Sequence, residues 1–116
     1  MKMVNLRTEL ENTLGISCKY GKNDLTSKPP FLMYSGAGAI NKFADNKVYS
    51  TKSLYNIGYY FKNKNEAFER SIEDVFNKNN IIWEKSEDIF VATENIFGIV
   101  YQIEIIEKFT EGINGK

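Results

Sequence analysis

Histidine is absent from this chain of 116 residues, and cysteine occurs only once, as Cys18. Without histidine the chain lacks the commonest general base, the usual partner of a serine or cysteine nucleophile, and a frequent zinc ligand. A single cysteine cannot form a disulfide within the chain. We therefore expect that the protein is not an enzyme, that it binds no metal or cofactor, and that Cys18 is a buried structural thiol.

Arginine and proline are scarce, with two residues each, and no apolar run is long enough to cross a bilayer. Because arginine makes most bidentate contacts to guanine and phosphate, we expect no dedicated surface for nucleic acid. The N-terminus shows no apolar segment of the secretory type. We therefore expect a soluble protein that is made in the cytoplasm and has no membrane partner.

The length and the 42% of apolar residues fit one domain with one core. We expect residues 1–116 to form this single domain, with a core over about residues 3–106. Residues 107–116 contain two glycines and an asparagine and are expected to form a flexible tail.

Two segments have the three- and four-residue spacing of an amphipathic helix. The first covers residues 3–14 and is followed by Gly15, which suits the end of a helix. The second begins after Asn63, the expected N-cap, and ends at residues 79–80. Its apolar face is expected to hold Phe68, Ile72, Val75 and Phe76, and its solvated face Glu69, Arg70, Glu73 and Asp74.

The remaining apolar segments alternate with the period of strands. They predict a short strand over residues 16–20, a long hairpin over 31–61, and a second hairpin over 81–106. The distal half of the first hairpin, residues 36–52, is too polar and too small to cover a core and is expected to project. The order α-β-ββ-α-ββ therefore predicts an α+β fold, with an antiparallel-rich sheet of about five strands and two helices.

Few residues suggest chemistry. The segment Ser35–Ala39 is expected to be a flexible stretch of the hairpin. Gly36–Asn41 is glycine-rich, but it precedes no helix and lacks a third glycine, so we interpret it as part of a flexible hairpin arm and not as a phosphate-binding loop. The carboxylates of Glu73 and Asp74, and of residues 84–88, are interpreted as ordinary surface charge.

The zero net charge hides two oppositely charged halves. Residues 1–62 hold nine basic and four acidic side chains, a net charge of +5, and residues 63–116 hold six and eleven, a net charge of −5. One interpretation is chance together with an acidic helix face. The other is a subunit with one basic and one acidic surface, which suits head-to-tail contacts in a ring.

Six segments carry a recognisable pattern, in the order Pro29–Tyr34, Phe43–Tyr49, Tyr55–Phe61, Glu66–Glu69, Ile82–Lys85 and Tyr101–Glu104. In this pattern the chain resembles small proteins from the tail-morphogenesis gene clusters of phages and prophages of Gram-positive bacteria. It is similar to the minor-capsid or tail-terminator (tail-completion, neck) group. The resemblance covers about residues 3–106 and includes no catalytic signature.

The resemblance implies a virion structural protein with a helix-flanked α+β fold, which forms a ring, typically of six subunits. Such a ring caps the tail tube and joins it to the head connector. The implied partners are further copies of the chain, the tail tube protein and the head–tail connector protein, while DNA only passes through the ring channel. The implied location is the tail or neck of the virion, after assembly in the host cytoplasm, and the isolated subunit can be a monomer. Whether the step is that of an adaptor, a stopper or a terminator stays open.

The tip of the first hairpin supplies the candidates for a subunit interface. We expect it to contact a neighbouring subunit, either by strand pairing or by packing apolar side chains into a groove. The candidates are Phe43, Asp45, Asn46, Lys47 and Tyr49.

A second hypothesis comes from the seven tyrosines. A small soluble binding or immunity-type protein would use a tyrosine-rich sheet to engage one partner. Tail-tube and tape-measure genes beside this one would favour the structural protein, and a toxin gene would favour the alternative.

Overall fold

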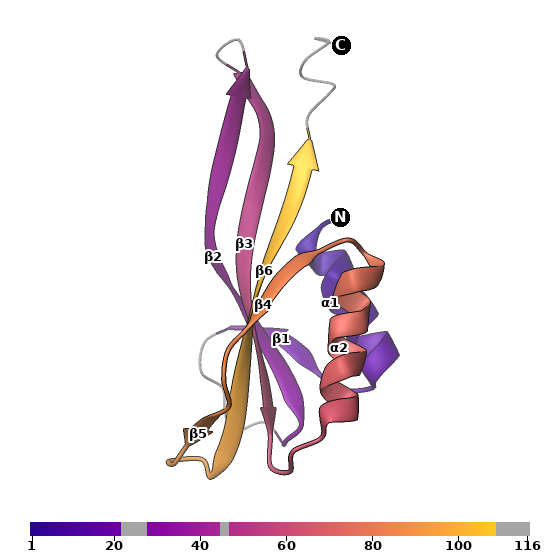
Figure 1. Cartoon of the computed structure of the whole chain (residues 1–116), viewed down its shortest axis with the longest axis vertical. Coiled ribbons are helices and arrows are strands. Elements are labelled where there is room, and N and C mark those ends of the chain that lie inside the picture. The colour runs from indigo at the N-terminus through magenta and orange to yellow at the C-terminus, as the bar shows by residue number, and fades with distance from the viewer. Residues whose placement is uncertain (22–27, 45–46, 109–116) are drawn as a thin grey trace.

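The computed structural model describes residues 1–21, 28–44 and 47–108, and this part of the chain has the predicted α+β architecture (Figure 1). It contains two helices and six strands. In chain order they are α1 Met3–Leu14, β1 Cys18–Tyr20, β2 Phe31–Ala44, β3 Lys47–Phe61, α2 Glu66–Lys78, β4 Ile82–Lys85, β5 Ile89–Val91 and β6 Ile96–Lys108. The order α-β-ββ-α-ββ is confirmed, and the sixth strand arises because the strand predicted before β6 consists of two pieces, β4 and β5.

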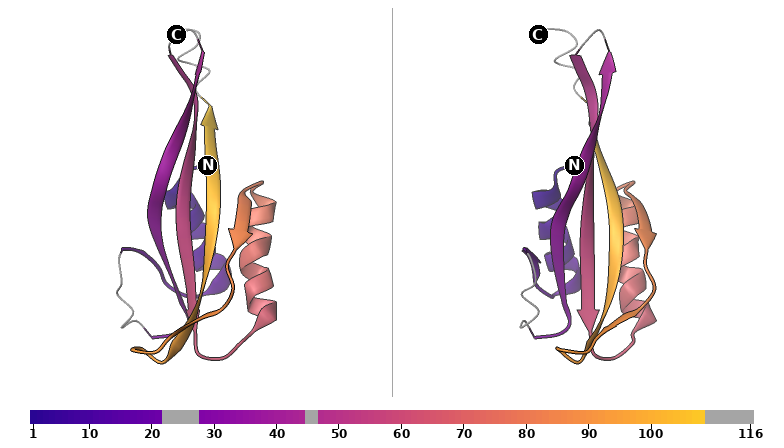
Figure 2. Two further views of the ribbon diagram at one scale, coloured as in Figure 1. Left: turned by 60° about the vertical axis from the view of Figure 1, so that its left-hand side comes forward. Right: turned by 90° about the vertical axis from the view of Figure 1, so that its left-hand side faces the viewer.

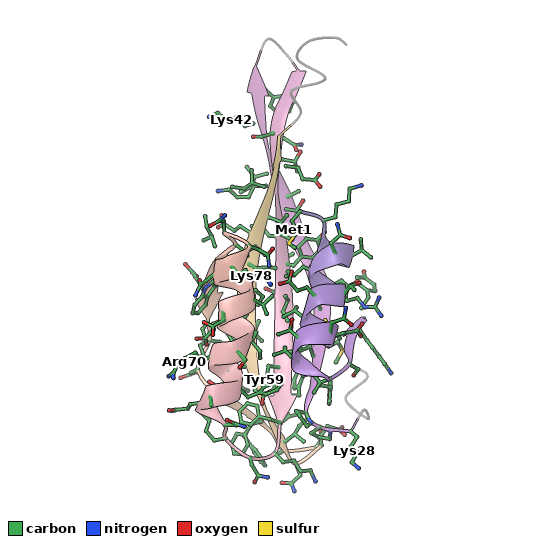
Figure 3. The ribbon with its side chains drawn as sticks, turned by 90° about the vertical axis from the view of Figure 1, so that its right-hand side faces the viewer. Met1, Lys28, Lys42, Tyr59, Arg70 and Lys78 are labelled. Atoms are coloured by element: carbon green, nitrogen blue, oxygen red, sulfur yellow. The ribbon has the colours of Figure 1, made fainter. Side chains whose placement is uncertain are left out.

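The six strands form one mixed sheet in the order β1-β2-β3-β6-β4, with β5 paired to the beginning of β6. The pair of β1 and β2 is parallel, and every other pair is antiparallel. Both helices lie on the same face of the sheet, as the two side views in Figure 2 and the view in Figure 3 show. In the described part of the chain, the other face carries no helix. We call it the open face.

The main core lies between the helices and the sheet. Leu6 and Leu10 of α1 and Ile72 and Phe76 of α2 are fully buried there. Because successive side chains of a strand point to opposite faces, alternate residues of the strands complete the core. These strand residues are Leu32, Ile57, Tyr59, Phe61, Ile99, Tyr101, Ile103 and Ile105.

Helix α1 has the predicted bounds and ends at Gly15, whose φ of 71° is left-handed. The helix also covers the outer edge of β1. The N–H and C=O of Cys18 are bound by α1 side chains: the N–H donates to Glu11 Oε2 at 2.9 Å, and Arg7 Nε donates to the carbonyl at 2.7 Å. The lower end of this sheet edge is therefore closed.

Helix α2 begins two residues later than a cap at Asn63 would place it, so that prediction is wrong. The N-cap is Asn65, whose side-chain oxygen accepts a hydrogen bond from the N–H of Phe68 at 3.1 Å. Both asparagines have the side chain that an N-cap needs, and the choice depends on which register turns Ile72 and Phe76 toward the sheet.

Three strand boundaries also differ from the prediction. The strand expected over residues 16–20 is shorter and consists of β1, Cys18–Tyr20. Residues 107 and 108, expected to belong to the tail, are part of β6. The segment Ser35–Ala39 is not a flexible stretch but part of β2, because pairing with β3 satisfies its backbone despite its small side chains. A bulge at Ala37 interrupts the register there. Residues 22–27 of the predicted loop and 109–116 of the predicted tail lie outside the described residues.

A smaller apolar cluster lies on the open face, around the buried side chains of Phe31, Met33 and Ile96. Tyr60 packs against it, with its ring stacked on that of Phe31 at a centroid distance of 5.2 Å. The same ring lies across two glycines of the sheet. A Cβ atom would stand 2.9 Å from the ring at Gly98 and 2.6 Å from it at Gly58. The two glycines therefore make room for Tyr60.

The upper parts of β2, β3 and β6 extend beyond the helices, as Figure 1 shows. We call residues 36–44, 47–54 and 104–108 the arm. The molecule measures 52 × 25 × 21 Å along its principal axes. The projection predicted for the distal half of the first hairpin is confirmed.

We expect Phe76→Ala to lower the free energy of unfolding by about 3–5 kcal/mol, because the ring is fully buried between Trp83 and Tyr101. Denaturant unfolding measures the loss. As a control, Phe43→Ala removes a ring that is 62% exposed and should cost at most about 0.5 kcal/mol. A loss below about 1 kcal/mol at Phe76 would contradict the placement of α2.

We expect Gly98→Ala to lower the free energy of unfolding by about 1–3 kcal/mol, because the new Cβ displaces the Tyr60 ring. In a Tyr60→Ala background the same change should be neutral or slightly stabilising, since alanine in a strand is less costly than glycine. A double-mutant cycle by denaturant unfolding measures the difference. Equal effects in both backgrounds would show that the ring is not the cause.

Candidate functional site

The structure places one of the five interface candidates fully. Phe43 lies near the end of β2, and 62% of its surface is exposed. Lys47 and Tyr49 lie in β3, but their side chains are not among those that the structure describes. Asp45 and Asn46 lie outside the described residues. Among these candidates, only Phe43 can therefore be assigned an exposed apolar side chain on the arm.

Further apolar side chains are exposed on the open face at the arm. Ile40 of β2 is 57% exposed, and Ile106 of β6 is 46% exposed. Both are paired with Lys52 of β3, so the three residues form one row across the sheet. A surface-exposed ion pair between Lys52 and Glu104, 3.4 Å apart, adjoins this row. Apolar side chains around a few polar ones are typical of surfaces that contact another protein.

A second exposed apolar group lies at the opposite end of the molecule, on the β5–β6 hairpin. Ile89 and Phe90 of β5 are about half exposed, and Phe97 of β6 is 36% exposed. The Phe97 ring packs between Phe61 and Phe90, at centroid distances of 5.8 and 5.1 Å. Each end of the elongated molecule therefore presents apolar side chains.

The charge asymmetry of the sequence becomes an asymmetry between the two sides of the sheet. The basic half of the chain contains α1, β1, β2 and β3, and the acidic half contains α2, β4, β5 and β6. Since the sheet order is β1-β2-β3-β6-β4, the boundary between the halves runs between two neighbouring central strands. One lateral side thus carries Lys19, Lys28 and Lys42, and the other Glu84 and Glu87.

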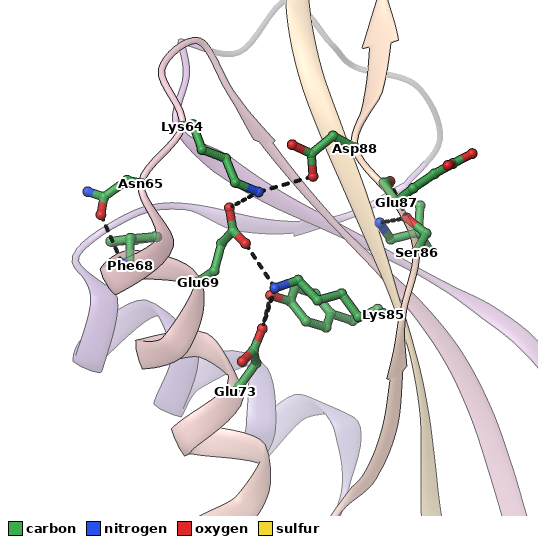
Figure 4. Close-up of polar contacts among 11 residues, drawn as sticks. Lys64, Asn65, Phe68, Glu69, Glu73, Lys85, Ser86, Glu87 and Asp88 are labelled. Carbon is green, nitrogen blue, oxygen red and sulfur yellow. Dashed lines mark hydrogen bonds and ion pairs between the residues drawn. The ribbon is translucent and has the colours of Figure 1, made fainter.

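A chain of ion pairs joins α2 to the sheet and to the loop before it (Figure 4). Glu69 is 1% exposed, and its two oxygens lie 2.9 Å from Nζ of Lys64 and 2.9 Å from Nζ of Lys85. Lys85 Nζ also lies 2.8 Å from Glu73 Oε2, and Lys64 Nζ lies 3.1 Å from Asp88 Oδ1. The prediction that Glu69 and Glu73 are solvated is therefore wrong, because both carboxylates face β4 and its lysine.

The electrostatics of this network favour fixed charges and not proton transfer. The hydrogen bond to Glu69, against some desolvation, raises the pKa of Lys64, and the carboxylate of Asp88 adds to the effect. Burial lowers the pKa of Lys85, but its bonds to Glu73 and Glu69 outweigh that and raise the pKa overall. The ammonium groups stay charged at neutral pH, so the network holds α2 in place electrostatically.

Tyr101 extends the network into the core. Its hydroxyl donates a hydrogen bond of 2.8 Å to Glu73 Oε2, and its ring contacts that of Phe76 edge-on at 5.5 Å. Burial, and then the Glu73 carboxylate, raise the pKa of this tyrosine. At this end of the network, the Glu73 carboxylate therefore accepts a hydrogen bond from a neutral donor of the core as well as pairing with Lys85.

Cys18 is fully buried, as predicted for a structural thiol. Burial, with a contribution from Glu11, raises the pKa of this thiol to about 12. Because the thiolate is the reactive form, Cys18 is unreactive at neutral pH. Within residues 1–21, 28–44 and 47–108, no three acidic or cysteine side chains converge as ligands of a metal ion. Neither helix of this part of the chain has the length and apolarity to cross a membrane.

No family model and no curated protein matches the chain. The resemblance to the tail-terminator group therefore depends on the six segments named above, and it remains a prediction.

The ion-pair network is the feature that sequence reasoning missed, although a signal for it exists. Glu69 precedes Ile72, Glu73 and Phe76 by three, four and seven residues, which is the spacing of one helix face. Two acidic residues on an apolar stripe indicate buried partners of opposite charge. Lys85 could not have been named as that partner, since only the pairing of β4 with β6 brings it to α2.

We expect the free energy of unfolding to fall as the pH rises from about 9 to about 12. Burial raises the pKa of Cys18 to about 12, burial and then Glu69 raise the pKa of Tyr59 to about 12, and Tyr101, Lys64 and Lys85 also have raised pKa values. The unfolded chain loses these protons first, so the stability that they contribute is complete below about pH 9 and is lost above it. For Tyr59 alone the loss is on the order of 2 kcal/mol.

Denaturant unfolding at a series of pH values measures this loss. Tyr59→Phe is the matched control, because it keeps the stacking of the ring on Phe61 and Phe68 and removes only the titrating hydroxyl. Its curve should fall less steeply than that of the wild type. Identical curves would contradict a titrating role of Tyr59.

Proposed function

We propose that this protein is a non-enzymatic structural subunit of the neck or tail end of a phage or prophage particle. It acts as a tail terminator: several copies form a ring on the tail tube and join it to the head connector. The observation that carries the proposal is the arm, a three-stranded extension with exposed apolar side chains that no helix of the described chain covers. The resemblance of the six sequence segments supports the same function.

The arm acts by contacting a neighbouring subunit. A subunit that offers one patch and receives a different patch makes a heterologous contact, which closes into a ring when the rotation between copies is right. Ile40, Phe43 and Ile106 are exposed in one subunit and lose this exposure in the contact. The opposite charges on the two lateral sides favour the same head-to-tail order.

The strength of such a contact can be modest. Full burial of one aromatic or branched side chain contributes on the order of 2 kcal/mol. Two or three such side chains barely offset the entropy cost of association in free solution. On a tail tube, several contacts form side by side on one template, so the ring is stable there while the isolated subunit stays monomeric.

The alternative, a binding or immunity-type protein with a tyrosine-rich sheet, has less support. Tyr59 and Tyr101 belong to the core, and the ring of Tyr60 packs against Phe31 and the two glycines Gly58 and Gly98. Among the tyrosines whose side chains the structure describes, Tyr20 alone is largely exposed, at 72%. One exposed tyrosine among those described is a weak basis for partner recognition by tyrosines.

We expect an arm-shortened variant to fold normally and to fail in assembly. The variant replaces residues 41–51 by Asn-Gly, a pair that forms a two-residue turn and keeps Ile40 opposite Lys52. Its melting temperature should stay close to that of the wild type, since the main core lies below this segment. A large decrease in melting temperature would show that the arm belongs to the core.

Electron microscopy of particles tests the function itself. Particles made without this gene should have tail tubes of uncontrolled length that are not joined to heads, and the arm-shortened variant should not restore them. Phe43→Ala, which retains the arm, should restore them partly. Normal particles in the absence of the gene would exclude the proposed function.

A further inference from the structure

The outer edge of β2 has a neighbouring strand, β1, at its lower end, and none among the described residues at its upper end. β1 pairs only with Leu32–Tyr34, and its own outer groups at Cys18 are bound by α1. From Ser35 to Ala44, the described residues provide β2 with a neighbour on the β3 side alone. Such an edge presents unpaired N–H and C=O groups that can bind another strand. Residues 35–41 contain no charge and no proline, two features that commonly prevent such pairing, although the bulge at Ala37 makes the stretch irregular.

The opposite edge of the sheet is formed by β4, which pairs with β6 through Ile82–Lys85. In the part of the chain that the structure describes, no strand pairs with the outer side of β4. This side carries the exposed Glu84 and Lys85, and the Lys85 ammonium is paired with Glu69 and Glu73, whereas the β2 side carries the exposed Lys28 and Lys42. The two edges are therefore complementary in charge.

The two edges also match in height along the sheet. The register places Lys85 in one row with Tyr101, Ile57 and Tyr34, which is the row where β1 ends. The residues Glu84 to Ile82 occupy the next rows upward, which reach Ser35 and Gly38 of β2. If a second copy stands upright beside the first, its β4 therefore lies just above β1, along the part of β2 whose outer side has no partner strand in residues 1–21, 28–44 and 47–108.

The strand directions suit this contact. β2 and β6 are both antiparallel to β3, and β4 is antiparallel to β6. In an upright neighbour, β4 therefore runs antiparallel to β2, which is the pairing with the better hydrogen-bond geometry.

We infer that the β2 edge of one copy pairs with the β4 edge of a second copy, so that the sheets of neighbouring subunits join side by side. The contact is centred on Ser35 of one copy and Glu84 of the next. The two edges differ, so the contact is heterologous and leaves one free edge of each kind at the ends of an open assembly. This inference builds on the proposed function, because it names the surfaces by which the ring closes.

Cross-linking between two variants that each carry one added cysteine tests the contact. Ser35 and Glu84 share one row of the sheet, separated within a chain by β3 and β6. Because the two added cysteines are on different chains, only a contact between two copies can join them. The native Cys18 does not interfere, since it is buried and remains a thiol.

Under mild oxidation, an equimolar mixture of the Ser35→Cys and Glu84→Cys proteins should form a disulfide-linked dimer, at the highest concentration at which both are soluble. Each variant alone should stay monomeric. The matched control is Thr8→Cys, an exposed position on α1, which should not cross-link with Glu84→Cys above the level of random collision.

Two results would overturn the inference. One is a mixture that cross-links no better than the Thr8→Cys control, and the other is efficient dimerisation of Ser35→Cys alone, which would show that two β2 edges meet. The experiment uses purified protein, so its outcome does not depend on the particle phenotype. Cross-linking without a tail defect would reject the proposed function alone, and a tail defect without cross-linking would reject the edge contact alone.

Discussion

The difference in length between the strands and the helices determines the shape of this protein. A strand of 15 residues such as β3 spans about 50 Å, whereas the 12 or 13 residues of each helix span about 20 Å. Two helices that stand side by side on one sheet face therefore cover less than half of its length. The uncovered part becomes the arm, which strand pairing orders while side chains such as Ile40 and Phe43 stay exposed. These exposed side chains are the ones that the proposed subunit contact would bury.

The covered half of the sheet uses charge as well as apolar packing. Glu69 is a buried carboxylate held between two ammonium groups, and removing one partner would leave a buried charge without compensation. Such a network contributes little net stability compared with an apolar core. It holds the Glu69 and Glu73 carboxylates of α2 against Lys85 of β4.

Much of the fold could be predicted from local patterns. The bounds of α1, the buried face of α2 and the projection of the first hairpin follow from apolar periodicity and composition. The errors occur where one local pattern permits two structures. Asn63 and Asn65 are equally good caps on local criteria, and Ser35–Ala39 has the composition of a flexible segment. The solvated face assigned to Glu69 and Glu73 is wrong because their partner Lys85 lies on a strand distant in sequence.

Local patterns indicate which segments form helices and strands, which of their faces are apolar, and that the two halves of the chain carry opposite charge. These properties depend on neighbouring residues and on composition alone. The packing of the whole chain sets the rest: the charge boundary between two central strands, the position of Tyr60 over Gly58 and Gly98, and the sheet edges that have no partner strand among the described residues. Each of these depends on strand order and register, and pairings between segments distant in sequence follow from the packing of the whole chain and not from any local pattern.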